Sequence, residues 1–349
     1  MRSDKPERIL IVRLDRIGDV VLSTPAIRAV KRAFPESRLS VMVRPPCVDI
    51  VRGSPFVDTV ITYDKDGPEK GIAPAFRMIK KLRREKFDIA IVLHPTTRSH
   101  LAVFMAGIPV RVGYDRKLGW LLTKKVKHEK HLGKKHEIDY ALDLVRTIGC
   151  DDPDRSLFMP TNEENANTVD AIFKESGIQG KYPVVVIHPA ASCPSKQWPA
   201  DRFAEVAGAL KEEFRADIVI IGGLRERKVG EDLANSIKGD AVNLTGKTSI
   251  GELASVFRRS RLLISCDSGP VHVASAVGVP VVAIFGRSDK GLSPKRWGPT
   301  GGDDAILHKF IGCEACLAHN CKKEFMCLKA VSVEEVLSSS RKILSGALS

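Results

Sequence analysis

Short segments rich in valine, isoleucine and leucine alternate with helix-type segments along almost the whole chain. This alternation predicts parallel β-sheets flanked by helices, because a parallel strand pair needs a crossover segment, usually a helix, between its two strands. The strands expected in the first half are 8–14, 38–43, 58–63, 87–93 and 110–113, and those in the second half are 183–188, 216–221, 241–244, 261–265 and 280–285.

Helical periodicity fills the segments between these strands, as in 20–34, 201–214 and 249–259. The region 121–136 is basic and lacks apolar periodicity, so it is predicted to be a mobile loop. At 349 residues the chain is expected to hold more than one domain. We predict two Rossmann-like doubly wound α/β domains that face a cleft. The predicted boundaries are 1–165 for the N-terminal domain, 166–331 for the C-terminal domain and 332–349 for a closing helix.

The net charge of +13 is unevenly distributed. Residues 1–160 hold 31 Lys/Arg against 20 Asp/Glu, whereas residues 161–349 hold 24 against 22. An asymmetric basic half indicates an anionic partner, either nucleic acid, a membrane surface or a phosphorylated acceptor, unless it is only a solvated face. Aromatic residues make up 6% of the chain and no recognition-module signature is present, so we expect no nucleic-acid partner.

No apolar run approaches the roughly 18 residues that a membrane span needs. The apolar stretch Ile9–Val12 is too short for a signal peptide and is followed by Arg13. A cytoplasmic protein is therefore expected, and the eight cysteines should be reduced. Four of them could hold a structural zinc ion or could be loop thiols without a metal. These four are Cys313, Cys316, Cys321 and Cys327.

The expected strand 261–265 runs through Asp267, Ser268, Gly269 and Pro270 into a helix-type segment. Proline is tolerated in the first helical turn, so Ser268 and Gly269 should present free amides at the helix N-terminus. Such a terminus is a ready site for phosphate or diphosphate. His272 could point back to the phosphates or could be a buried structural histidine.

A second motif, Leu14 to Asp19, follows the first strand. Gly18 permits a tight turn beside a ligand. Asp19 could be a general base that takes a proton from an acceptor hydroxyl, or it could only cap the following helix. Asp15 is a nearby competitor for the role of base.

Further polar candidates follow strands of the second half. Ser192 could donate to phosphate oxygens and Lys196 could neutralise them. Glu226, just past Gly222 and Gly223, could bind ribose hydroxyls, or it could belong to a surface charge cluster. The loop that ends at Thr248 could hold the base of a nucleotide through its backbone groups. The chain lacks a P-loop and a Gly-x-Gly-x-x-Gly after its first strand, which disfavours a P-loop nucleotidase and a dehydrogenase.

Taken in order, these pieces resemble the family of bacterial lipopolysaccharide heptosyltransferases, which use ADP-heptose. The matching segments are 9–20, 110–114, 188–199, 244–246 and 267–272, and the cysteine cluster is also similar to one in many members. The resemblance implies the glycosyltransferase B architecture, with the acceptor bound by the N-terminal domain and the nucleotide sugar by the C-terminal domain.

The resemblance also implies residue roles. Asp19 matches the catalytic base, Glu226 the ribose-binding acid, and Thr248 falls in the segment that faces adenine. The diphosphate positions are matched by Lys196, Asp267, Ser268, Gly269, Pro270 and His272, and Ser192 lies in the loop of Lys196.

The expected reaction is therefore an inverting transfer of heptose from ADP-heptose to an anionic acceptor in the lipopolysaccharide inner core. It should take place at the inner face of the inner membrane, with the protein peripherally associated. No cofactor is expected to be required, because no Asp-x-Asp pair is suited to hold Mg²⁺ against the diphosphate. The alternatives are a transferase using another nucleotide sugar, a sugar-nucleotide epimerase, a non-catalytic nucleotide-binding protein, and a zinc-stabilised adaptor.

Overall fold

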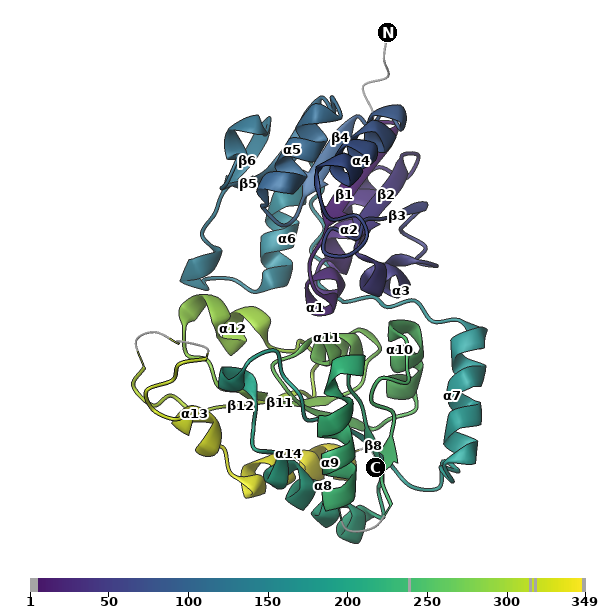
Figure 1. The fold of residues 1–349 in the computed structure, drawn as a ribbon, viewed down its shortest axis with the longest axis vertical. Helices are drawn as coiled ribbons and strands as arrows, with labels where there is room; N and C mark the ends of the chain where they lie inside the picture. Colours follow the sequence, from purple (N-terminus) through teal and green to yellow (C-terminus); the bar gives the residue numbers. More distant parts are fainter. Residues whose placement is uncertain (1–5, 238–239, 314–315, 317–318, 347–349) are drawn as a thin grey trace. The chain divides into compact units, whose positions relative to one another are not determined.

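The computed structural model describes residues 6–237, 240–313, 316 and 319–346. The chain divides into two compact units, Met1–Pro160 and Thr161–Ser349 (Figure 1). The boundary expected after residue 165 lies inside helix α7 (Glu163–Glu175), which packs against α10 (Ile250–Arg258) of the second unit.

The N-terminal unit is built on a six-stranded parallel sheet in the order β3-β2-β1-β4-β5-β6. The strand order reverses between β1 and β4, which makes their carboxyl ends the switch point where ligands bind in doubly wound sheets. The strands are β1 (Arg8–Arg13), β2 (Arg38–Val43), β3 (Thr59–Thr62), β4 (Ile89–Val92), β5 (Val110–Asp115) and β6 (Lys124–Lys127).

The C-terminal unit repeats this topology in the order β12-β11-β10-β7-β8-β9, with its switch point between β7 and β10. The doubly wound fold class predicted from the alternation is confirmed. The strands are β7 (Val184–His188), β8 (Asp217–Ile220), β9 (Val242–Asn243), β10 (Leu262–Cys266), β11 (Val281–Phe285) and β12 (Ala305–His308).

The edge strands β6 and β12 were not predicted. Edge strands face water and carry charge, so β6, with the sequence Lys-Lys-Val-Lys, has no apolar signal. The prediction of a mobile loop over 121–136 is wrong, because this region contains β6 and a 3-10 turn at Lys130–Leu132. Lys130 is buried there.

In the N-terminal unit, the single helix expected over 20–34 is divided between two helices, α1 and α2. Pro25 lies in the first turn of α2, where its missing N–H costs no hydrogen bond within the helix. Helix α2 packs on α6, and α4 packs on α5. The helices are α1 (Ile17–Val21), α2 (Thr24–Ala33), α3 (Val48–Val51), α4 (Ile72–Arg84), α5 (Thr97–Met105) and α6 (Glu137–Arg146).

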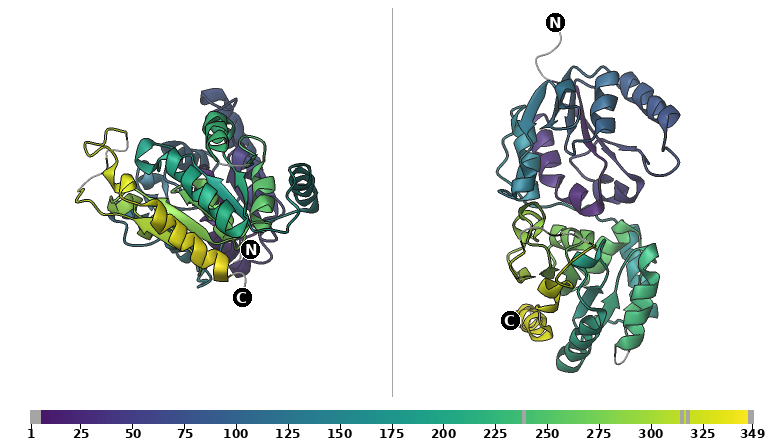
Figure 2. Two further views of the ribbon diagram at one scale, coloured as in Figure 1. Left: turned by 90° about the horizontal axis from the view of Figure 1, so that it is seen from below. Right: turned by 60° about the vertical axis from the view of Figure 1, so that its left-hand side comes forward.

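In the C-terminal unit, helix α14 lies within the segment 332–349 that was predicted as a closing helix, and it packs beside α8 (Figure 2). Residues 347–349 of that prediction lie outside the described residues. Ser249 and Glu252 form the capping box of α10, with N···O distances of 3.1 and 2.6 Å. The remaining helices are α8 (Ala200–Phe214), α9 (Arg227–Ser236), α11 (Gly269–Ala276), α12 (Pro294–Trp297), α13 (Met326–Lys329) and α14 (Val333–Gly346).

Over the part of the chain that the structure describes, no helix is both long enough and apolar enough to cross a membrane.

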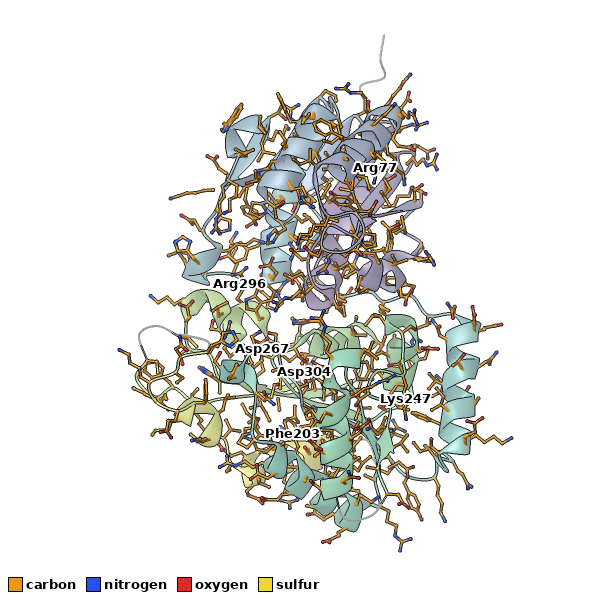
Figure 3. The ribbon with its side chains drawn as sticks, in the orientation of Figure 1. Arg77, Phe203, Lys247, Asp267, Arg296 and Asp304 are labelled. Carbon is orange, nitrogen blue, oxygen red and sulfur yellow. The ribbon has the colours of Figure 1, made fainter. Side chains whose placement is uncertain are left out.

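Trp198 lies at the centre of the C-terminal core and is fully buried. Its indole packs edge-on against Phe203, with ring centroids 4.9 Å apart (Figure 3 labels Phe203). Its Nε1 donates to the carbonyl oxygen of Val331 at 3.0 Å. Trp198 therefore joins the loop after β7 to the segment that precedes α14.

We expect Trp198→Ala to lower the free energy of unfolding by about 3–5 kcal/mol, because it leaves a cavity and removes a buried hydrogen bond. Chemical denaturation measures the loss. Trp120→Ala is the control, because Trp120 is 71% exposed and its removal should change stability by less than about 0.5 kcal/mol. Equal losses in the two variants would contradict the role of Trp198.

Candidate functional site

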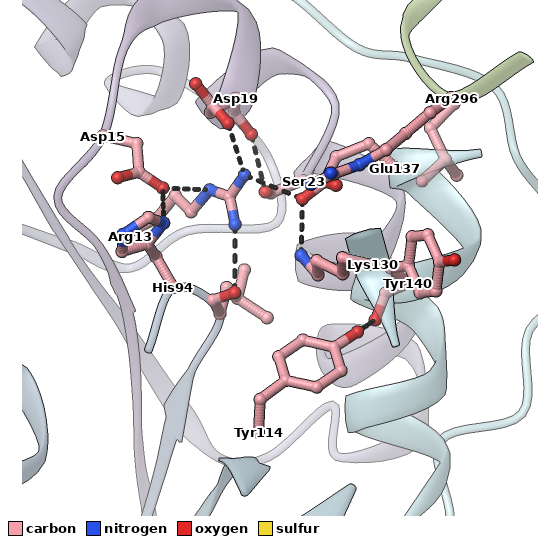
Figure 4. A network of polar contacts seen from close by, with 12 residues as sticks. Arg13, Asp15, Asp19, Ser23, His94, Tyr114, Lys130, Glu137, Tyr140 and Arg296 are labelled. Atoms are coloured by element: carbon pink, nitrogen blue, oxygen red, sulfur yellow. Dashed lines mark hydrogen bonds and ion pairs between the residues drawn. The ribbon is translucent and has the colours of Figure 1, made fainter. Parts of the chain in front are cut away.

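The N-terminal unit gathers charged side chains at its switch point, around Arg13 at the end of β1 (Figure 4). The side chain of Arg13 is 1% exposed. Its guanidinium lies 3.3 Å from Asp15, 2.9 Å from Asp19 and 3.2 Å from Glu137. It also donates to the carbonyl oxygen of Leu93 at 3.0 Å. One buried cation thus holds three carboxylates from two parts of the sequence.

Two more titratable side chains complete this charge cluster. Lys130 Nζ lies 2.6 Å from Glu137 Oε1, and both side chains are buried. His94, just after β4, places Nδ1 2.9 Å from Asp15 Oδ2. The loop that was predicted to be mobile therefore supplies a buried cation to the site.

The surroundings separate the two candidate bases. Burial raises the pKa of Asp19, and the charges of Asp15 and Glu137 add to the rise while Arg13 opposes it. Burial also acts to raise the pKa of Asp15, but Arg13 and His94 outweigh it and hold this pKa below its usual value. Two carboxylates whose pKa values are pushed apart are typical of an acid–base site. Asp19 is the better proton acceptor of the two.

Asp19 is also placed to meet a ligand. It lies in the first turn of α1, which begins at Ile17, and its carboxylate contacts Arg13. Its side chain is 20% exposed, whereas those of Arg13 and Glu137 are almost fully buried. The alternative that Asp19 only caps the helix therefore does not account for the contact between its carboxylate and Arg13.

The C-terminal unit forms the predicted strand–helix junction at its own switch point. Strand β10 ends at Cys266, Ser268 occupies the position before α11, and Pro270 lies in the first turn. Ser268 Oγ lies 2.9 Å from Ser265 Oγ and 3.1 Å from Nδ1 of His188, the last residue of β7. The hydroxyl and the start of α11 thus lie where the two central strands end.

Lys196 reaches the same junction from the 3-10 turn Pro194–Lys196. Its Nζ lies 2.6 Å from Asp267 Oδ2, and Figure 3 labels Asp267. Both side chains are largely buried. The carboxylate of Asp267 therefore fixes the ammonium group beside the N-terminus of α11.

Glu226 joins the junction through His188, whose Nε2 lies 3.5 Å from Glu226 Oε2. The hydrogen bond to His188 lowers the pKa of Glu226. The same oxygen accepts from the backbone N–H of Gly223 at 2.6 Å. At Gly222 a Cβ atom would lie 3.0 Å from this oxygen and 2.9 Å from Thr245. The turn after β8 therefore requires glycine for Glu226 to sit as it does.

For the other predicted donor-site residues, the structure gives the position in the fold and the burial of the side chain. Ser192 is exposed in the loop after β7, Thr248 is half-buried before α10, and His272 is buried in α11. Their predicted ligand contacts stay predictions.

Two residues of this region were not selected from the sequence. His188 was placed at the end of a strand and at the start of a segment that matches the family, but it was given no role, although a polar residue that closes an apolar strand was a usable signal. Arg287, after β11, donates to Ser195 Oγ at 3.1 Å and to Cys193 Sγ at 2.9 Å, and so holds the turn of Lys196. Nothing in the sequence around Arg287 marks it.

Burial raises the pKa of Cys327, and the charges of the other three clustered cysteines, Cys313, Cys316 and Cys321, add to the rise. Among the residues that the structure describes, no group of three or more His, Cys, Asp or Glu is arranged to hold a metal ion. The structural zinc stays a prediction.

Two doubly wound α/β units, each with charged side chains at its switch point, form a glycosyltransferase B type of architecture. Comparison with known proteins gives the family. The model of glycosyltransferase family 9 (heptosyltransferase) matches residues 75–326, and the chain belongs to this family. It is therefore a glycosyltransferase of glycosyltransferase B architecture. The match covers the C-terminal site and begins after Asp19, so the assignment of Asp19 depends on the geometry above.

Named relatives span most of the chain. Lipopolysaccharide heptosyltransferase 2 of Escherichia coli is 24% identical over 298 residues, covering 82% of this chain and 85% of the relative. A family 9 glycosyl transferase from Veillonella parvula is 25% identical with a TM-score of 0.87, covering 97% and 98% of the two chains. The E. coli ADP-heptose lipopolysaccharide heptosyltransferase II has a TM-score of 0.81 at 20% identity, covering 98% and 100%.

We expect Arg13→Met to lower the free energy of unfolding by about 3–5 kcal/mol near neutral pH, because it leaves buried carboxylates without their cation. Without the guanidinium, the pKa values of these carboxyls rise above their unfolded values. The loss should therefore grow as the pH rises and shrink as the carboxyls protonate at low pH.

Denaturation of the wild type and the variant between pH 5 and pH 8 measures this dependence. Arg38→Met, at an exposed position at the start of β2, is the matched control. The double variant Arg13→Met/Glu137→Gln should recover part of the loss. A loss that does not vary with pH would contradict the electrostatic account.

Proposed function

We propose that this chain transfers heptose from ADP-heptose to an anionic acceptor in the inner core of lipopolysaccharide, with inversion at the anomeric carbon. The observation that carries the proposal is the convergence of Lys196, Ser268 and Glu226 where β7 and β10 end. The E. coli protein of the same fold is named as an ADP-heptose heptosyltransferase, which supports the choice of donor.

The diphosphate of the donor would lie at the N-terminus of α11. The backbone amides of Ser268 and Gly269 and the helix dipole favour an anion there, with Lys196 as the fixed counter-charge. These groups are aimed at the charge that grows on ADP as it leaves, without having to reorganise. We assign Glu226 to the ribose hydroxyls, Thr248 to the adenine side, and Ser192 and His272 to the phosphates.

In the proposed reaction, the acceptor hydroxyl attacks the anomeric carbon while Asp19 takes its proton. The bond from that carbon to the diphosphate oxygen breaks, and ADP leaves with the bonding electrons. A single displacement inverts the centre and forms no covalent intermediate with the enzyme. The raised pKa of Asp19 suits this role, because a general base works best when its pKa approaches the working pH.

No metal ion is assigned to this reaction, because Lys196 and the start of α11 supply the charge stabilisation that the diphosphate needs. A donor with another nucleotide remains the alternative, since the loop that ends at Thr248, predicted to hold the nucleobase, has few side chains that would select adenine. The surplus of basic residues in 1–160 supports an acceptor that carries phosphates or carboxylates at the inner face of the inner membrane.

We expect Asp19→Asn to lower kcat by about 10²–10⁴-fold, the usual contribution of a general base, while ADP affinity stays within a few-fold. For the wild type, kcat/KM should fall as the pH drops through the raised pKa of Asp19, at a pH above the ordinary aspartate value of about 3.9. Steady-state kinetics over a pH series and calorimetric ADP binding measure both effects.

Asp15→Asn is the comparison variant for this experiment and should retain more activity. Because burial raises the pKa of Asp19, its ionised form lowers stability above the unfolded pKa, so Asp19→Asn should not lower the melting temperature at neutral pH. Parallel losses of activity and stability would show a structural role instead.

We expect ADP to bind more tightly than UDP or GDP, and Lys196→Ala to weaken ADP binding by about tenfold or more, as for a lost charged hydrogen bond. In this variant Asp267 would also face the diphosphate without its cation. Lys196→Ala/Asp267→Asn should therefore recover part of the affinity.

Isothermal titration calorimetry measures all three nucleotides. Tighter binding of UDP or GDP would keep the transferase and change the donor. Unchanged ADP affinity in Lys196→Ala would remove Lys196 from the site.

A further inference from the structure

Large apolar side chains are exposed on one side of the N-terminal unit. They are Ile72 (77% exposed) and Phe76 (53%) on α4, Leu101 (39%) and Phe104 (45%) on α5, and Trp120 (71%) in the turn Gly119–Leu121. No other large apolar side chain of this unit is exposed among the described residues. Helix α4 contacts α5, and α5 contacts the turn Gly119–Leu121. Figure 1 shows α4 and α5 side by side. We call the exposed side chains of these three neighbouring elements the α4–α5 face.

Helix α4 turns two different sides to its surroundings. Met78 and Leu82 are buried beneath it, at helical spacing. Ile72, Phe76 and Lys80 recur every four residues and are exposed. The apolar residues of the exposed side are therefore not needed for the core of the unit.

The same helix carries a dense positive charge. Five exposed cations lie between residues 77 and 84, and the helix holds no acidic residue. Arg83 donates to the carbonyl oxygen of Met105 on α5. The other four make no ion pair with any described residue; these are Arg77 (labelled in Figure 3), Lys80, Lys81 and Arg84.

Elsewhere in this unit cations are commonly paired, as in Lys31 with Asp58 and Arg155 with Asp139. Arg77 and Lys81 line a pocket together with Asp64 and Glu69, whereas Lys80 and Arg84 form no ion pair with any described residue and do not line that pocket. The α4–α5 face also includes Arg111, whose guanidinium lies 5.4 Å from the ring centre of Phe104. Apolar and cationic side chains are intermixed on one surface.

We propose that the α4–α5 face docks on the surface of an anionic phospholipid bilayer. The apolar side chains would enter the interface between headgroups and acyl chains, and the cations would lie at the phosphates. Aromatic residues favour that interface, and the long stems of lysine and arginine let their charges reach it.

Charge complementarity selects this occupant. A nucleic acid would match the cations and leave Ile72 and Leu101 exposed to water. An apolar protein partner would cover those side chains and leave four unpaired cations beside them. A bilayer with anionic headgroups satisfies both sets of side chains. The inference rests on the proposed function in one respect, since an acceptor anchored in lipid must be reached at the bilayer surface.

The test is co-sedimentation of the whole protein with vesicles of phosphatidylethanolamine and phosphatidylglycerol, and with vesicles of phosphatidylcholine alone. The wild type should bind the anionic vesicles and lose binding as salt rises. Lys80→Glu/Arg84→Glu should lower partitioning by about 25-fold or more, since each basic residue near such a surface contributes about fivefold. Ile72→Ser/Phe76→Ser should lower it by at least about tenfold.

Matched controls lie in the C-terminal unit. Phe310→Ser/Met326→Ser removes two exposed apolar side chains, and Lys174→Glu/Lys342→Glu reverses two exposed charges. Both should keep partitioning within about twofold. The proposal would be overturned if the α4 variants bound the anionic vesicles as well as the wild type does, or if the control variants lost as much binding as the α4 variants. Binding to a protein or nucleic acid but not to vesicles would also overturn it.

A second assay separates this inference from the proposed function. Transfer from ADP-heptose to a deacylated, water-soluble acceptor should proceed at the wild-type rate in both α4 variants, because the substituted residues belong neither to the charge cluster around Arg13 nor to the junction at α11. A loss of this transfer in the α4 variants would overturn the docking role. If the wild type itself fails to transfer, the proposed function fails, while the vesicle result still decides the face.

Discussion

The buried guanidinium of Arg13 is the interaction on which the N-terminal site depends. It ends β1 at the switch point and joins α1, α6 and the segment after β4 through Asp19, Glu137 and the carbonyl of Leu93. Burial acts to lower the pKa of Arg13, but the carboxylates around it outweigh this and raise the pKa. The site therefore keeps a permanent positive charge in its interior. An ordinary lysine could not bridge so many acceptors with fixed geometry.

Burial and the charges around Arg13 leave one carboxylate, Asp19, with a raised pKa, and it also has the largest exposed fraction of the three. Glu137 is shared between Arg13 and Lys130, and Asp15 is shared between Arg13 and His94. Each of these acids is held from two sides. Asp19 has only Arg13 as a cation within contact distance among the described residues, and it is the most exposed of the three. The least stabilised anion of the cluster is thus the one that a ligand can reach.

Much of this fold could be predicted from the sequence, because buried parallel strands are nearly continuous apolar runs. The strand 38–43 was placed to the residue and the others to within a few residues. Edge strands were missed where water faces them, as at Lys124–Lys127. The break between α1 and α2 was missed because the apolar spacing runs on across Pro25.

A local motif marks Asp19, Lys196 and Ser268 in the sequence, and their roles stay predictions. The contacts around such residues could not be predicted, since a contact such as that between Arg13 and Glu137 joins residues 124 positions apart. Lys130 was hidden in a basic stretch, where a buried lysine has the same sequence signature as a solvated one. Packing alone distinguishes the two.

The two units share one topology and yet carry opposite chemistry at their switch points. In the C-terminal unit the strand end leads into α11, an eight-residue helix whose first turn leaves amides free, and Lys196 adds a cation. In the N-terminal unit the strand end leads into α1, whose first turn is taken by the unit's own carboxylate, Asp19. In the proposed reaction the first arrangement binds the diphosphate, whereas the second supplies the base. On this proposal the same strand–helix junction serves both roles, and the residue in the first helical turn decides which.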